Sequence, residues 1–69
     1  MLGEQEALVV DVQTFDVHGI AYTDVAVAYR DRSVERARLG PEAVPGGLAA
    51  GERVLVTRVA NMIVSVRRP

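Results

Sequence analysis

Cysteine is absent from this sequence of 69 residues, as are lysine and tryptophan, and the single histidine is His18. Without cysteine the chain has no disulfide, no thiolate zinc site and no iron–sulfur cluster. One histidine supplies too few ligands for a His-based metal site, so we expect neither a metal nor a cofactor. Domains this small usually need a disulfide, a metal or a partner subunit to stabilise the fold, and association with another chain is the one of these that remains.

Long apolar runs are also missing. No stretch approaches the roughly 20 residues that span a bilayer, and the acidic N-terminus lacks the pattern of a signal peptide. We therefore expect a soluble, cytoplasmic chain without membrane insertion, and an excised domain of a larger protein would have the same composition. The length predicts a single domain over residues 1–69. The hydrophobic content of 49% is typical of a globular domain.

The net charge of −1 conceals an uneven distribution of charge. Residues 1–29 carry five acidic side chains and no basic one, whereas residues 30–69 carry eight arginines and four acidic side chains. One interpretation is codon usage in a GC-rich genome, which favours arginine over lysine. The alternative is that planar guanidinium groups are needed to contact carboxylates or phosphates.

Valine-rich segments with period-two spacing predict five β-strands, at residues 6–17, 20–30, 34–39, 53–59 and 62–67. His18-Gly19 predicts a turn between the first two, because glycine adopts a positive φ without steric cost. The connection over residues 41–50 is rich in proline and glycine, and residues 41–44 have room for one helical turn. Leu48 is expected to fill the end of the barrel.

Matching apolar with apolar side chains predicts the register of the second and third strands. A three-residue loop, Asp31–Ser33, sets Val27 opposite Ala37 and Val25 opposite Leu39. The same register leaves the arginines of the third strand on the outside. A four-residue loop would mix the two faces.

The last hairpin turns at Ala60-Asn61, and its loop length decides which side chains are buried. A three-residue loop is expected, and a two-residue loop would reverse the faces. With the three-residue loop, the inward side chains are Val54, Val56, Val64 and Val66, and the outward ones are Leu55, Thr57, Val59, Ile63 and Ser65.

Five short strands with regular turns predict an all-β fold, a small five-stranded barrel of the OB or SH3-like kind. The segments Gly51–Val56 and Val59–Val66 resemble the closing hairpin of such barrels, and most of all that of the soluble barrel domain of NfeD-type membrane-associated proteins. A similar tail occurs in the bacterial initiation-factor-1 type OB fold and in molybdate-binding barrels. The resemblance covers roughly the last 25 residues and implies the fold rather than the function. The sequence departs from the molybdate binders in lacking a Ser-Ala-Arg-Asn-like segment, and from the NfeD type in lacking a membrane-spanning region.

No group of residues has the composition of a catalytic or metal site. The one histidine and the serines lack the partners of a catalytic triad, and the acidic residues do not have the spacing of a calcium loop. We therefore expect no enzymatic activity. The residues weighed and set aside are His18, Ser33, Ser65, Asp11, Asp16, Asp24 and the Gly46-Gly47 pair.

Two surfaces remain as candidate binding sites. The first is the outward apolar row of Leu55, Val59 and Ile63. The second is the basic face of Arg30, Arg36 and Arg38, extended by Arg67 and Arg68. An exposed apolar patch usually marks an interface, which predicts a non-enzymatic protein-interaction module that self-associates or binds another protein. The alternative is an OB-like nucleic-acid-binding protein in which the arginines follow the phosphate backbone.

Overall fold

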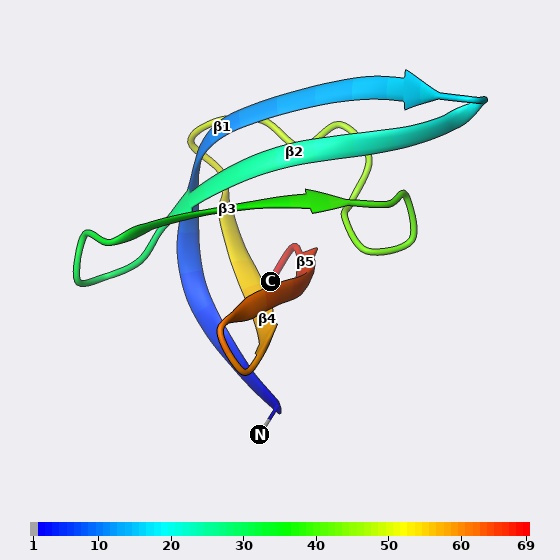
Figure 1. Cartoon of the computed structure of the whole chain (residues 1–69). Helices are drawn as coiled ribbons and strands as arrows, with labels where there is room; N and C mark the ends of the chain where they lie inside the picture. Colours follow the sequence, from blue (N-terminus) through cyan, green and yellow to red (C-terminus); the bar gives the residue numbers. More distant parts are fainter. Residues whose placement is uncertain (1) are drawn as a thin grey trace.

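Five antiparallel strands form the structure of residues 2–69, the part of the chain that our computed structural model describes (Figure 1). They are β1 (Leu2–Val17), β2 (Ile20–Ala28), β3 (Val34–Leu39), β4 (Arg53–Val59) and β5 (Met62–Arg67). The predicted all-β class is confirmed, and the last three strands have the predicted bounds. These residues contain no helix, and thus none that is long and apolar enough to cross a membrane.

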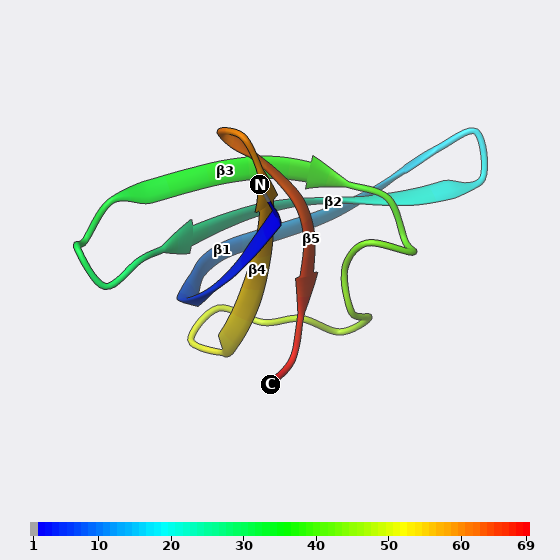
Figure 2. The same cartoon turned by 90° about the horizontal axis from the view of Figure 1, so that it is seen from below.

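β1 is the central strand, in the order β3-β2-β1-β4-β5. Its first half pairs with β4 as far as Leu8, and its second half pairs with β2 from Leu8 to the turn. β1 bends between these halves, so that the sheet curls into a half-barrel (Figures 1 and 2). β3 and β5 approach each other without a hydrogen-bonded ladder, so the closed barrel expected from the sequence is open along this seam.

Valine side chains fill the inside of the half-barrel. Leu48 and Val44, from the connection between β3 and β4, pack against them, which confirms that Leu48 belongs to the core. A valine buries little area, so the core that these side chains form is small. The largest fully buried side chains are Val9, Val25, Val27, Val54 and Val56.

The connection between β3 and β4 is a series of turns. The Ala43 N–H donates to the Gly40 carbonyl at 3.1 Å, and the helical turn allowed for residues 41–44 does not form. The Val66 N–H on β5 donates to the Ala43 carbonyl at 2.8 Å. The connection thus gives β5 a backbone partner on the side where β3 does not pair with it.

A β-bulge at Val10 changes which side chains of β1 face the core. The register with β2 skips this residue, between Val9 and Asp11. Val9 is buried before the bulge, and Val12 packs against the core after it. Strict alternation would place Val9 and Val12 on opposite faces, so the period-two spacing expected for this strand does not hold across Val10.

The register of β2 and β3 differs by two residues from the prediction. Val25 pairs with Ala37, where Leu39 was expected. The loop between the strands is five residues long, residues 29–33, and is closed by a hydrogen bond from the first N–H to the last carbonyl. A shift of two residues keeps every side chain on its own face, so the arginines of β3 still point outward as predicted.

The register of β4 and β5 corrects the prediction near the turn. Ala60 and Asn61 form a two-residue turn with Ala60 at φ 56°, and a bulge follows. Because the tight turn comes first, Ile63 faces the core with 7% exposure, whereas Val64 is 37% exposed. Both orientations are the reverse of those expected. Beyond the bulge the register becomes that of a three-residue loop, and Val66 is buried as predicted.

Candidate interaction surface

β1 and β2 continue past the end of β3 as a two-stranded arm, defined here as residues 15–22 (Figures 1 and 2). His18 and Gly19 form the turn at its tip, with φ angles of 52° and 83°. Two consecutive positive φ angles suit a tight hairpin, because their twist matches that of the flanking strands. The Gly19 N–H also donates to the Asp16 carboxylate at 2.7 Å. The turn predicted from the sequence is confirmed.

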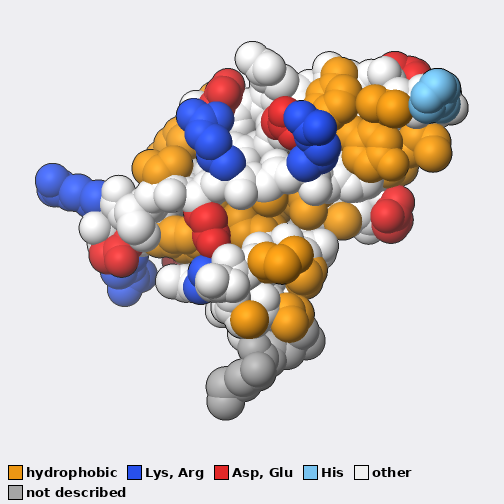
Figure 3. All heavy atoms as spheres, in the orientation of Figure 1, with side chains coloured by type: hydrophobic (Ala, Val, Ile, Leu, Met, Phe, Trp, Pro, Cys, Tyr) orange, Lys and Arg blue, Asp and Glu red, His pale blue; other side chains and the backbone are white. Residues whose placement is uncertain are grey.

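The outer face of the arm, defined as Phe15, Val17, Ile20 and Tyr22, is apolar. Phe15 pairs with Tyr22, and their ring centroids lie 6.1 Å apart. Val17 pairs with Ile20 nearer the tip, and these two side chains are 40% and 47% exposed. In the space-filling view, hydrophobic side chains gather beside the histidine at the tip (Figure 3). The chain therefore leaves a contiguous apolar patch open to solvent on a projecting element.

Two ion pairs border the outer face where the arm meets the rest of the sheet. Arg38 donates two hydrogen bonds to Asp24, at 2.9 and 3.1 Å, and its guanidinium carbon lies 4.6 Å from the centre of the Phe15 ring. The hydrogen bond from Arg38 lowers the pKa of Asp24 below its ordinary value. Beside this pair, Arg36 lies 3.7 Å from Asp11. The border of the apolar face therefore carries balanced charge.

The apolar row predicted from the sequence is not a continuous surface. Ile63 lies in the core, so its expected outward orientation is wrong. Leu55 points outward but is only partly exposed, because it lies between its cross-strand partners Glu6 and Arg67. Val59 is exposed at the end of the β4–β5 hairpin. Polar side chains therefore separate the members of the row that remain outside.

Four of the five arginines proposed as an anion-binding face form ion pairs. Three of their four acidic partners belong to residues 1–29, so the two differently charged parts of the sequence form ion pairs with each other across one sheet. Within residues 2–69, only Arg30 of the five forms no ion pair. The pairs and their N–O distances are Arg36–Asp11 at 3.7 Å, Arg38–Asp24 at 2.9 Å, Arg67–Glu4 at 2.6 Å and Arg68–Glu52 at 2.9 Å.

A half-buried polar network, which the sequence pattern did not indicate, links β3 to β4 near the open seam. The Tyr29 hydroxyl donates to the Glu35 carboxylate at 2.5 Å, and Arg58 donates to the other carboxylate oxygen at 3.0 Å. The hydrogen bond from Tyr29 lowers the pKa of Glu35, while burial and the carboxylate raise the pKa of Tyr29. The Glu35 carboxylate is therefore bonded through both of its oxygens, whereas the buried Nε of Arg58 has no hydrogen-bond partner. The effect of this network is on stability.

The polar residues weighed as catalytic groups do not come together. His18 is exposed at the tip of the arm, and the Ser33 hydroxyl donates to Asp31 in its own loop at 2.5 Å. Asp11 and Asp24 each pair with a different arginine. No three histidine or acidic side chains lie close enough to hold a metal ion in the described part of the chain.

The outer face of the arm was missed although the sequence contains its signal. The two-residue turn at His18-Gly19 was predicted, and such a turn pairs the residues immediately before and after it. Counting back from that turn places Val17 beside Ile20 and Phe15 beside Tyr22. All four residues are apolar, so the patch follows from the turn length and the alternation of β-strands.

Comparisons of the chain with protein-family models, with curated proteins and with solved structures found no match. The fold assignment therefore depends on the structure itself, a curled antiparallel sheet of five strands that is consistent with a barrel-like fold.

Proposed function

We propose that this protein is a non-enzymatic assembly module that self-associates through the outer face of its arm. The observation that carries the proposal is the contiguous apolar surface that the arm exposes at a distance from the core. A compact monomer of 7.4 kDa exposes about 4,200 Å². This chain exposes 4725 Å², an excess expected of an element that projects from the body. Burial of that excess surface in an assembly would give the additional stability that a small domain without disulfide or metal needs.

A second copy of the chain is the partner that the charges favour. The two ion pairs at the border are already neutral, so two outer faces meet without repulsion between like charges. In a two-fold dimer each face contacts its own copy. If the arms run antiparallel, Val17 and Ile20 of one copy lie against Phe15 and Tyr22 of the other. Aliphatic side chains then pack on aromatic rings on both sides of the axis.

The proposed dimer is weak. Four side chains bury a few hundred Å² for each subunit, which is below the standard size of a stable interface. At about 25 cal/mol per Å² this area contributes several kcal/mol before the cost of association is subtracted. We therefore expect a concentration-dependent equilibrium rather than a permanent dimer.

Sedimentation equilibrium over a range of protein concentrations tests the proposal. The wild-type protein should pass from monomer to dimer as concentration rises, and Ile20→Asp should remain monomeric because it places an unpaired charge in the contact. Val34→Asp is the matched control, since Val34 is 57% exposed on β3, outside the arm. This control should dimerise as the wild type does. A wild-type monomer at millimolar concentration, or a dimer that Ile20→Asp leaves unchanged, would overturn the proposal.

Nucleic-acid binding is the second candidate function. In its favour, two aromatic rings stack on each other and one of them, Phe15, lies beside an arginine, as in proteins that bind single strands. Against it, the arginines nearest to the rings already contact carboxylates. Phosphates would have to compete with these carboxylates, and for this reason we rank self-association first.

A further inference from the structure

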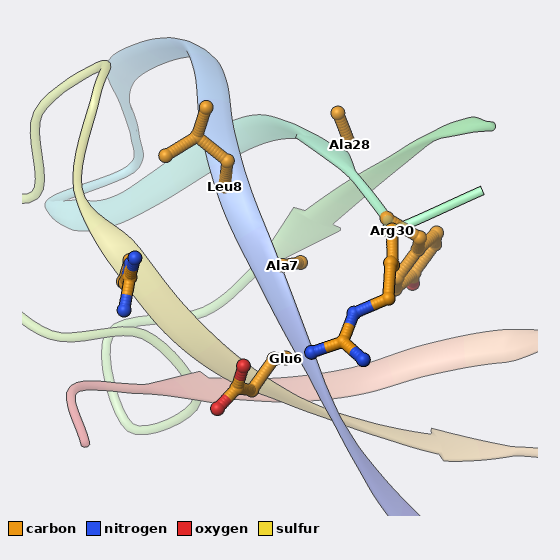
Figure 4. A pocket seen from close by; sticks show the side chains of 7 residues that line it. Glu6, Ala7, Leu8, Ala28 and Arg30 are labelled. Atoms are coloured by element: carbon orange, nitrogen blue, oxygen red, sulfur yellow. The ribbon is translucent and has the colours of Figure 1, made fainter. Parts of the chain in front are cut away.

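A hollow of about 330 Å³ lies where β1 passes from its pairing with β2 to its pairing with β4 (Figure 4). Leu8 is the residue at this transition, because it pairs with Ala28 on one side and with Arg53 on the other. β2 ends at Ala28, so the chain turns away from β1 there and leaves the space open. The residues around the hollow are Glu6, Ala7, Leu8, Ala28, Tyr29, Arg30 and Arg53.

Two arginines at this hollow have no ion pair. Of the eight arginines in the chain, five form ion pairs within residues 2–69, and the three others are Arg30, Arg32 and Arg53. Arg30 and Arg53 both line the hollow. Figure 4 shows the Arg30 side chain reaching across it toward β1. Guanidinium groups without a carboxylate partner offer several N–H donors to an anion.

The other walls limit the kind of anion that fits. Leu8 is 43% exposed and Ala28 is partly exposed, so the hollow has apolar surface beside its cations. Glu6 adds one negative charge on the same wall. Two arginines and one glutamate give the hollow a net charge of +1, which one negative charge neutralises, whereas a phosphate dianion leaves an excess negative charge beside Glu6.

We propose that the hollow binds a carboxylate carried on a short aliphatic group. The arginines take the carboxylate, and Leu8 and Ala28 contact the aliphatic part. Two sources share this chemistry, a small aliphatic acid and the C-terminus of a peptide that ends in an aliphatic residue. The site lies outside the arm, so it is independent of self-association.

Titrations followed by ¹H–¹⁵N NMR test the site with four probes: butyrate, acetyl-Ala-Val with a free carboxylate, the same dipeptide as its amide, and inorganic phosphate. We expect saturable shifts at the backbone amides of Leu8 and Ala28 with butyrate and with the free dipeptide. The amide form should cause none. Tighter binding of butyrate identifies the small acid as the source, and tighter binding of the dipeptide identifies the peptide terminus.

Variants connect the shifts to the two arginines. Arg30→Gln combined with Arg53→Gln should weaken carboxylate binding about fivefold, as expected for exposed ion pairs. Arg32→Gln is the matched control, since it removes an arginine that has no ion pair and lies outside the hollow. Glu6→Gln should strengthen phosphate binding more than butyrate binding. The proposal is overturned if no probe causes saturable shifts at these amides, if the double variant binds as the wild type does, or if phosphate binds more tightly than both carboxylates.

Discussion

Asp24 on β2 and Arg38 on β3 are direct cross-strand partners, and their side chains meet in a two-point ion pair with N–O distances of 2.9 and 3.1 Å. The acid comes from the half of the sequence that has no basic residue, and the arginine comes from the half that has all of them. Two other pairs, formed by Asp11 and by Glu4, join the same halves. The uneven charge of the sequence therefore serves contacts within one sheet.

This pairing predicts that the protein does not bind single-stranded nucleic acid. Phosphates gain little from an arginine that is already neutralised, and release of counterions is small. Fluorescence anisotropy with labelled DNA and RNA oligonucleotides at low salt should show no binding. The opposite result would be micromolar binding that weakens steeply with salt, with a smaller salt dependence in Arg36→Ala or Arg38→Ala. It would show that the basic face binds the phosphate backbone.

The register of the last hairpin predicts unequal effects of two neighbouring substitutions. Ile63→Ala removes a buried side chain and should lower the free energy of unfolding by about 2–4 kcal/mol. Val64→Ala changes an exposed side chain and should lower it by less than about 1 kcal/mol. Urea unfolding followed by circular dichroism measures both. A larger loss for Val64→Ala would mean that the three-residue loop is the correct one.

The polar network near the seam predicts a loss of stability at alkaline pH. Burial raises the pKa of the folded-state Tyr29 above its ordinary value of 10.0. A group with a raised folded-state pKa contributes its full stability below the unfolded pKa, and this contribution is lost as pH rises above it. Thermal unfolding midpoints should therefore fall as pH increases past about 10.

Tyr29→Phe separates this effect from general alkaline unfolding. The variant should be less stable at neutral pH, because Glu35 loses a hydrogen bond, and its midpoint should fall less between neutral and alkaline pH. Tyr22→Phe is the control and should keep the alkaline slope of the wild type. Equal slopes in wild type and Tyr29→Phe would mean that Tyr29 is not responsible.

Much of the fold follows from local rules that act on short segments. Alternating valines predicted all five strands, and His18-Gly19 and the connection over residues 41–50, rich in proline and glycine, predicted where strands end. Two registers were not predicted correctly. The register of β2 and β3 depends on a five-residue loop, which is longer than the polar break Asp31–Ser33, and the register of β4 and β5 depends on a bulge near Val64. A further bulge at Val10 changes which side chains of β1 face the core, and neither bulge is evident from a count of loop residues.

The candidate surfaces were harder to predict than the strands. The row of Leu55, Val59 and Ile63 depended on one loop length, and a single-residue error there exchanges the faces. The arginine face was placed correctly on the outside of β3, but the sequence does not show which carboxylates lie across the sheet. Those partners come from β1 and β2, and only the strand order brings them together.

Intermolecular nuclear Overhauser effects test the proposed dimer most directly. In a mixture of ¹³C-labelled and unlabelled protein at high concentration, a filtered experiment records only contacts between copies. The proposal predicts contacts from the methyl groups of Val17 and Ile20 to the rings of Phe15 and Tyr22, and their loss in Ile20→Asp. Intermolecular contacts that arise from Val34 or Val64 instead, or no contacts at a concentration where the protein sediments as a dimer, would contradict self-association through the arm.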